Sequence, residues 1–312
     1  MNVEHPTSNI EHRMKIHDRE GTFLQNCAII CILLNNANFG IKKDDIVHNS
    51  GHSPGITGIP IRAERIIGYY IHLGGMIVKY ILAEMVTERL IREIGMVAKP
   101  LPEQIKILET ELPTGKARFE SALYQAEKLK KITIGKRSLG NDGGGTVVMM
   151  VADDTYDIPF ILADIAFDSI GKGSITVGFQ LRPLVKDEES TKKYIDPFLT
   201  WYNGIDKLPS EPVHLDIGEF LKANPAPLNY LGRIPYDYLD EVLKFTEQFF
   251  DILLDIYWKE EPVTDAQRRK KMEAFRSEYN QNIFGDDFSG KMLIKAFGRK
   301  TAALFYDYLV YL

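Results

Sequence analysis

The sequence has little cysteine, no long uninterrupted apolar run and no excess of positive charge. Its 312 residues include two cysteines, Cys27 and Cys31, which lack a second pair or a nearby histidine cluster. A zinc site is therefore not expected, and the pair is interpreted as buried thiols in a reduced, cytoplasmic protein. The formal net charge of −5 argues against a general nucleic-acid-binding protein, although local basic patches remain compatible with it.

The longest apolar stretches do not indicate a membrane span. Residues 27–34 are too few to cross a bilayer, and residues 66–78 are interrupted by His72 and a pair of glycines. The amino-terminal residues are polar and show no hydrophobic signal sequence. Hydrophobic residues make up 45% of the chain and charged residues 26%, a composition typical of globular proteins. We therefore expect a cytoplasmic protein without a membrane anchor.

Three segments are expected along the chain. Residues 1–20 are polar and predict a disordered tail. Residues 21–98 predict a helical extension of unknown role, with a compact helix near its start and a longer one in its second half. Two prolines directly after this segment mark the boundary to the main domain, residues 99–312.

The middle of the chain predicts a sheet. Residues 116–130 have the apolar spacing of an amphipathic helix, and Ile132 then opens a first strand. Residues 146–151 form a continuous apolar run, which indicates a strand covered on both faces. In residues 175–182 apolar side chains alternate with polar residues and glycine, the pattern of a half-buried strand. The links between the strands are too short for crossover helices, so the sheet must be largely antiparallel.

Helical patterns return toward the carboxyl-terminal end, and Thr264 with Gln267 predicts a capping box at the start of one helix. Leu228 opens a run that could add another strand. The helical patterns cover residues 188–202, residues 236–258 and the stretch from near Ser289 to Leu312. The order of helices, strand meander and helices predicts an α+β fold, an α/β/α sandwich with a central antiparallel sheet flanked by helices.

Asp164 is the first candidate for chemistry because it stands inside an otherwise apolar strand. A lone carboxyl in such a place must face water, find a partner or lose its charge. One interpretation is an acid that points outward from a sheet edge. The other is a buried carboxyl whose pKa is raised by its apolar surroundings, as a proton donor near neutral pH requires.

Asp286 and Asp287 form the second acidic candidate, at the start of the last helix. Their simplest interpretation is a helix cap, which the helix dipole favours, and the alternative is a role in a binding site. Two basic runs, residues 128–131 and 267–271, are interpreted either as solvated helix faces or as a docking patch for an acidic partner protein.

Two segments resemble the ferredoxin-dependent bilin reductases. Residues 156–164 are similar to the family's Tyr-Asp-Leu-Pro strand, which ends in a catalytic aspartate. Residues 279–287, followed by Lys-Ala-Phe-Gly at 295–298 and an aromatic-rich end at 305–308, are similar to the family's carboxyl-terminal signature. The resemblance covers residues 115–312.

The resemblance implies an activity and a set of residues. It implies radical reduction of a linear tetrapyrrole by single electrons from ferredoxin, with protons from the protein and no bound metal or flavin. Asp164 takes the place of the central proton donor, and Asp287 that of the second, substrate-contacting aspartate. Val147 stands where some members carry a histidine, and Asp286 stands where the family has an asparagine, so both are expected at the substrate. A glutamate of the family has no clear counterpart near residues 136–139.

These departures from the family's pattern keep other functions open. The related red chlorophyll catabolite reductases share the fold and vary these positions, so another tetrapyrrole is a candidate substrate. A non-catalytic tetrapyrrole carrier would bind the pigment without reducing it, and Val147 favours that function. A third hypothesis is a protein–protein interaction module built around residues 1–98, with the sheet domain as its scaffold.

Overall fold

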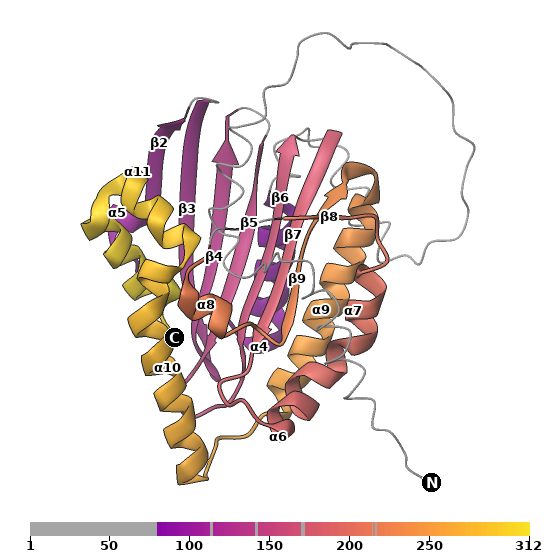
Figure 1. Ribbon diagram of the computed structural model, residues 1–312, viewed down its shortest axis with the longest axis vertical. Helices are drawn as coiled ribbons and strands as arrows, with labels where there is room; N and C mark the ends of the chain where they lie inside the picture. Colours follow the sequence, from indigo (N-terminus) through magenta and orange to yellow (C-terminus); the bar gives the residue numbers. More distant parts are fainter. Residues whose placement is uncertain (1–79, 113–114, 141–142, 170–171, 214, 216) are drawn as a thin grey trace.

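The computed structural model describes residues 80–312, except 113–114, 141–142, 170–171, 214 and 216. The expected tail and most of the expected helical extension therefore lie outside the described residues. The described chain forms an antiparallel sheet with helices on both of its faces (Figure 1). This arrangement confirms the predicted α+β sandwich.

The sheet is a meander whose central strands follow one another in the chain. Its order is β1-β3-β4-β5-β6-β7-β9-β8, and β2 also pairs with β3. The strands are β1 (Val97–Lys99), β2 (Ile107–Leu112), β3 (Gly115–Ala126), β4 (Leu129–Leu139), β5 (Gly143–Ala152), β6 (Phe160–Ser169), β7 (Lys172–Arg182), β8 (Glu211–Pro212) and β9 (Leu228–Pro235). Neighbouring strands pair antiparallel, as the short links predict.

Residues 116–130 do not form the helix that their spacing predicts. They form most of β3, the turn after it and the first residues of β4. The buried positions of β3 fall on every second residue, which is the period of a strand. Both edges of β3 are paired, to β1 and β2 on one side and to β4 on the other. This long-range pairing overrides the local helical spacing.

β5 and β7 are both enclosed between helical layers. All residues of β5 are buried, which confirms the prediction for residues 146–151. The half-buried pattern predicted for β7 is wrong, because Thr176, Gln180 and Arg182 on its polar side are also buried. The polar side of β7 faces a second layer of helices rather than water, since the ring of Tyr279 in that layer lies 5.9 Å from the Arg182 guanidinium.

The helices cover the two faces of the sheet. One layer contains α4 (Ile81–Ile94), α7 (Leu199–Ile205) and α9 (Leu239–Lys259), and the other contains α8 (Glu219–Ala223), α10 (Ala266–Asp286), α11 (Phe288–Phe305) and the π-helix η7 (Tyr306–Val310). In Figure 1, α8 and α11 lie in front of the sheet, and α4 lies behind it. Phe160 of β6 contacts Tyr279 of α10, with ring centroids 6.0 Å apart. Asp164 lies four residues further along β6 and therefore faces the same layer. We call this side the Asp164 face.

The helices expected after the strand meander are present, with one change of cap. The short helices α5 (Glu103–Lys106) and α6 (Glu188–Ser190), the π-helix η4 (Thr191–Ile195) and the 3-10 helices η5 (Asp196–Phe198) and η6 (Tyr236–Tyr238) complete the order. Asp265, not Thr264, is the N-cap of α10, and its carboxylate accepts the backbone N–H of Gln267 at 2.8 Å. The predicted capping box is therefore wrong by one residue.

The expected domain boundary after residue 98 falls inside β1. Val97 of this strand pairs with Gln125 of β3. Leu90 and Ile94 of α4 are buried in the same core as the sheet. The described residues before 99 therefore belong to the sheet domain, and a separate extension stays a prediction for the residues that precede them.

Candidate functional site

Asp164 forms a fully buried ion pair with Arg137 in the middle of the sheet. Nη1 of Arg137 donates to Oδ2 of Asp164 at 3.1 Å, and Nη2 donates to Oδ1. Both side chains are 0% exposed. β6 has a neighbouring strand on each side, so the interpretation of Asp164 as an edge acid facing water is wrong. The carboxyl has found a charged partner instead.

The register explains how Arg137 of β4 reaches a carboxyl two strands away. Arg137 is opposite Gly145 of β5, and Asp164 is opposite Val147 of the same strand. A Cβ atom at Gly145 would lie 2.3 Å from the carbonyl oxygen of Ile165. Because residue 145 is glycine, β5 and β6 can approach closely there. The side chain of Arg137 extends over this position to reach Asp164.

Burial and the guanidinium act in opposite directions on Asp164. Burial raises the pKa of Asp164, and the positive charge and the hydrogen bonds of Arg137 lower it. The net result is a pKa raised to about 6. At pH 7 roughly a tenth of a carboxyl with this pKa carries a proton. Asp164 can therefore exchange a proton close to neutral pH, which an exposed aspartate with an ordinary pKa cannot.

Val147 and Arg137 are the neighbours that define this site. Val147 is 2% exposed and is directly opposite Asp164 on the neighbouring strand, with its side chain on the same face. Its contact with a substrate stays a prediction. The sequence does not predict Arg137 as a site residue, although it lies in the segment, residues 136–139, where the resemblance implies a glutamate. Arg137 is two residues after Gly135 in β4, so both point to the same face of the sheet. Gly135 is opposite Val147, which is on the Asp164 face. That parity is the sequence signal that could have identified it.

Asp287 is the N-cap of α11 and is buried against a tyrosine. Its Oδ1 accepts the backbone N–H of Ser289 at 3.1 Å, and its Oδ2 accepts the hydroxyl of Tyr306. Asp287 is 1% exposed. The helix-cap interpretation is therefore confirmed, and the capping carboxylate also ties the start of α11 to the π-helix that follows it.

Asp286 connects α10 with α8. Its carboxylate accepts the backbone N–H groups of Phe220 at 3.2 Å and Leu221 at 2.7 Å. The N–H of Gly218 donates to the Asp286 carbonyl at 2.8 Å. A Cβ at Gly218 would lie 1.7 Å from Oδ1 of Asp286, so this contact requires glycine. The contact of Asp286 with a substrate stays a prediction.

The Asp164 face buries polar side chains along several strands. Thr133 of β4 donates to the Leu309 carbonyl of η7 at 3.0 Å. Gln180 and Arg182 of β7 are 3% and 1% exposed. The structure thus places Asp164, Val147 and the helix layer that carries Asp287 on one side of the sheet. Such a mixture of apolar surface and fixed polar groups is typical of small-molecule sites.

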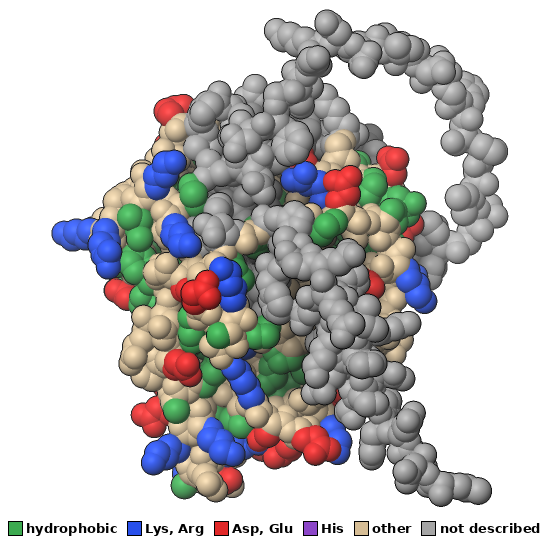
Figure 2. Space-filling model, in the orientation of Figure 1, with side chains coloured by type: hydrophobic (Ala, Val, Ile, Leu, Met, Phe, Trp, Pro, Cys, Tyr) green, Lys and Arg blue, Asp and Glu red, His purple; other side chains and the backbone are tan. Residues whose placement is uncertain are grey.

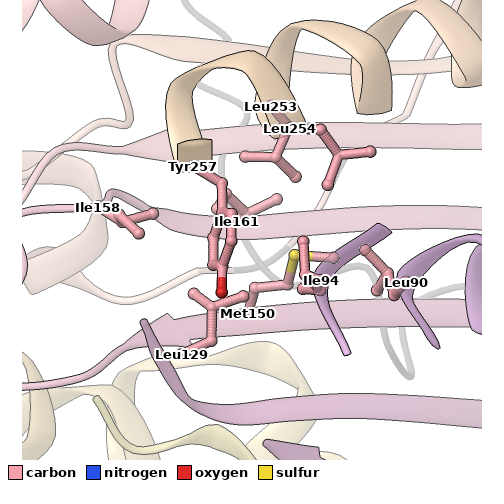
Figure 3. A pocket seen from close by; sticks show the side chains of 9 residues that line it. All are labelled: Leu90, Ile94, Leu129, Met150, Ile158, Ile161, Leu253, Leu254 and Tyr257. Atoms are coloured by element: carbon pink, nitrogen blue, oxygen red, sulfur yellow. The ribbon is translucent and has the colours of Figure 1, made fainter. Parts of the chain in front are cut away.

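The opposite face contains a small cavity that is unsuited to a pigment. Figure 3 shows its side chains, which come from α4, the sheet, the segment just before β6, and α9. They are Leu90, Ile94, Leu129, Met150, Ile158, Ile161, Leu253, Leu254 and Tyr257. The cavity volume is about 10 Å³, roughly the space of one water molecule, and its lining is apolar. We interpret it as a packing defect of the core.

The two basic runs differ in exposure. Nζ of Lys128 is buried and donates to the carbonyl oxygens of Tyr257 at 3.0 Å and Glu260 at 2.7 Å, at the end of α9. Both proposed interpretations of this run as surface are therefore wrong for Lys128. At the start of α10, residues 269–271 are exposed. Figure 2 shows Lys and Arg side chains, mixed with acidic ones, at this end of the molecule.

Comparisons with known proteins establish the fold and no further relation. No protein-family model matches the chain, and no curated protein sequence matches it. The chain is similar to the crystal structure of phytochromobilin synthase from tomato in complex with biliverdin. The TM-score is 0.57 at 14% sequence identity, over 72% of this chain and 79% of that chain. This likeness confirms the predicted fold class.

The helices of the described part of the chain do not meet the requirements of a bilayer span. None of them combines the length and the apolar character that a crossing needs. The longest, α9 and α10, have 21 residues each, and each carries charged residues along its length.

Proposed function

We propose that this protein binds a bilin or a related linear tetrapyrrole on the Asp164 face and reduces it with electrons from ferredoxin. The observation that carries the proposal is the fully buried Arg137–Asp164 pair, in a fold shared with a synthase that was crystallised with biliverdin. The resemblance of residues 156–164 and 279–287 to the bilin reductases supports the same conclusion. No bound metal or flavin is required by this chemistry.

Asp164 is the proposed proton donor. Each electron added to the pigment makes its nitrogen and carbon atoms more basic, and a nearby carboxylic acid then supplies the matching proton. A pKa of about 6 lets Asp164 release that proton and regain it from solvent. Val147 supplies apolar surface for the flat ring system, and Asp287 orients or protonates the substrate. Asp286 contributes by holding α8 beside the substrate.

The exposed cations at the start of α10 suit an acidic electron donor such as ferredoxin. Arg269, Lys270 and Lys271 occupy the first turns of the helix, where the dipole already provides positive charge. Positive side chains at the N-terminal end destabilise a helix. Binding to an acidic partner therefore explains these residues better than helix stability does. Complementary charge would speed the encounter with the donor and make it sensitive to salt.

A tetrapyrrole carrier is the second candidate function. Two observations favour it: Arg137 already pairs with the charge of Asp164, and Val147 has no proton to transfer. A carrier would bind the pigment on the same face and leave its double bonds intact. It would make no use of a ferredoxin.

A spectroscopic titration tests both functions. Purified protein is mixed with biliverdin, the visible spectrum is recorded, and reduced ferredoxin is then added under nitrogen. Binding followed by a further spectral change supports the reductase, and binding without that change supports the carrier. A spectrum identical to that of free biliverdin contradicts both.

Variants of the ion pair then test the role of Asp164. Asp164→Asn is expected to keep binding but to stall turnover, because the amide cannot donate a proton of suitable acidity. The double variant Arg137→Gln/Asp164→Asn, which places two neutral amides in the site, controls for the unmatched guanidinium. Full turnover by Asp164→Asn would remove this residue from the mechanism.

A further inference from the structure

We infer that Arg137 receives a carboxylate of the ligand in exchange for Asp164, so that binding loads a proton onto Asp164. The inference rests on the proposed tetrapyrrole binding and adds to it the residue that recognises the ligand's acid group. It also assigns the source of the proton for the first reduction step.

The geometry of Arg137 suits this exchange. Its two terminal nitrogens hold the two oxygens of Asp164 in a fork, and any other carboxylate can take the same arrangement. The guanidinium keeps its proton under all ordinary conditions. A buried Arg137 therefore has to exchange one anion for another rather than lose its charge. Biliverdin carries propionate groups, which are anions of the required shape.

Asp164, unlike Arg137, can lose its charge by taking up a proton. Within the described part of the chain, Arg137 is the one charged side chain whose field acts on this carboxyl. Its register neighbours, Val147 and Gly178, are apolar. A carboxylate that is separated from its counterion in such surroundings takes up a proton, because burial favours the neutral form.

Four other charged groups of the described residues on this side of the sheet have partners of their own. Arg182 lies four residues from Gly178 along β7, at a distance of about 13 Å by strand geometry. The partners are the Asn224 carbonyl for Arg182, Asp168 for Arg233, Tyr306 and Ser289 for Asp287, and the Tyr311 carbonyl for Lys131. None of these groups contributes to the pKa of Asp164.

The exchange balances in atoms and charge. The two hydrogen bonds from Arg137 to Asp164 break, and two form from Arg137 to the ligand carboxylate. A proton from solvent forms an O–H bond on Asp164. The ligand thus brings one negative charge and the solvent one positive charge. The acid made in this way stands next to the bound pigment and is consumed when the first electron arrives.

Calorimetry of biliverdin binding tests the inference. The titration is carried out at about pH 8, where Asp164 is ionised in the free protein, in buffers that differ in ionisation enthalpy. Uptake of about one proton per bound biliverdin supports the inference. Binding without uptake overturns it but leaves the proposed function standing. Absence of binding overturns both.

Matched ligands and variants locate the proton. Biliverdin dimethyl ester has no carboxylate, so it should bind about ten- to a hundred-fold more weakly and without proton uptake. Asp164→Asn and Arg137→Gln/Asp164→Asn should bind biliverdin without uptake, and Arg233→Gln should retain the uptake. Uptake that persists with the ester or in the double variant would place the proton on the pigment and overturn the inference.

Discussion

Asp164 is expected to cost the protein stability at neutral pH, and Asp164→Asn should therefore stabilise it. The pKa of Asp164 is raised by burial from 3.8 to about 6, despite the opposing effect of Arg137. Between pH 3.8 and about pH 6, Asp164 holds a proton in the folded protein that it has released in the unfolded chain. Stability therefore falls as the pH rises through this range, and the loss is complete above pH 6.

The magnitude follows from the size of the shift. A shift of about two pH units corresponds to about 3 kcal/mol, because each unit is worth about 1.4 kcal/mol. Asparagine resembles the protonated carboxyl in shape and carries no charge. The variant should therefore be more stable than the parent protein by about 3 kcal/mol at pH 8, and the difference should vanish below about pH 4.

Urea unfolding at a series of pH values measures this difference. Asp255→Asn is a suitable control, because Asp255 is 60% exposed and pairs with Lys259 on the surface. Its effect should stay within about 0.5 kcal/mol. If Arg137–Asp164 were a structural salt bridge, Asp164→Asn would instead cost about 3–5 kcal/mol at neutral pH. That result would refute the reasoning. A stability gain would mark Asp164 as a residue kept for function at the expense of stability.

Two further predictions concern the acids between α10 and α11. Gly218→Ala should remove about 1–2 kcal/mol from the free energy of unfolding in urea, because the new Cβ displaces the Asp286 carboxylate from the first turn of α8. Combined with Asp286→Ala it should add little further loss, and fully additive losses would contradict this coupling. Tyr306→Phe should cost about 1–3 kcal/mol in the same assay, since it removes the hydroxyl that donates to buried Asp287. An unchanged midpoint would show that this hydrogen bond does not stabilise the fold.

The central meander could be predicted because its signals are local. Strand alternation and short links specify antiparallel neighbours without reference to the rest of the chain. Asp164 could be singled out for the same reason, since a carboxyl inside an apolar run stands out in the sequence. The interpretation of β3 failed because Phe119 and Leu123, four residues apart, fit a helical face as well as one face of a strand. Its pairing with β2 and β4 decided between them.

The partners of the candidate acids could not be predicted because they come from distant segments. Arg137 is 27 residues from Asp164, and only the register of three strands brings them together. The Asp286 carboxylate caps a helix 65 residues earlier in the chain. Arg182 lies on a polar strand face that helices from the end of the chain enclose. Each of these contacts depends on tertiary packing. Alternation along β4 indicates only that Arg137 shares a strand face with Gly135, and it does not identify the residue that Arg137 pairs with.

Mass analysis of the pigment after a complete reaction tests the central claim most directly. Biliverdin is incubated with the protein and reduced ferredoxin, extracted, and compared with pigment from a reaction that contains Arg137→Gln/Asp164→Asn. The proposed function predicts a product heavier by a pair of hydrogen atoms from the parent protein and unchanged biliverdin from the variant. Bound but unchanged biliverdin from both, or equal reduction by both, would contradict the assignment of Asp164 as the proton donor of a bilin reductase.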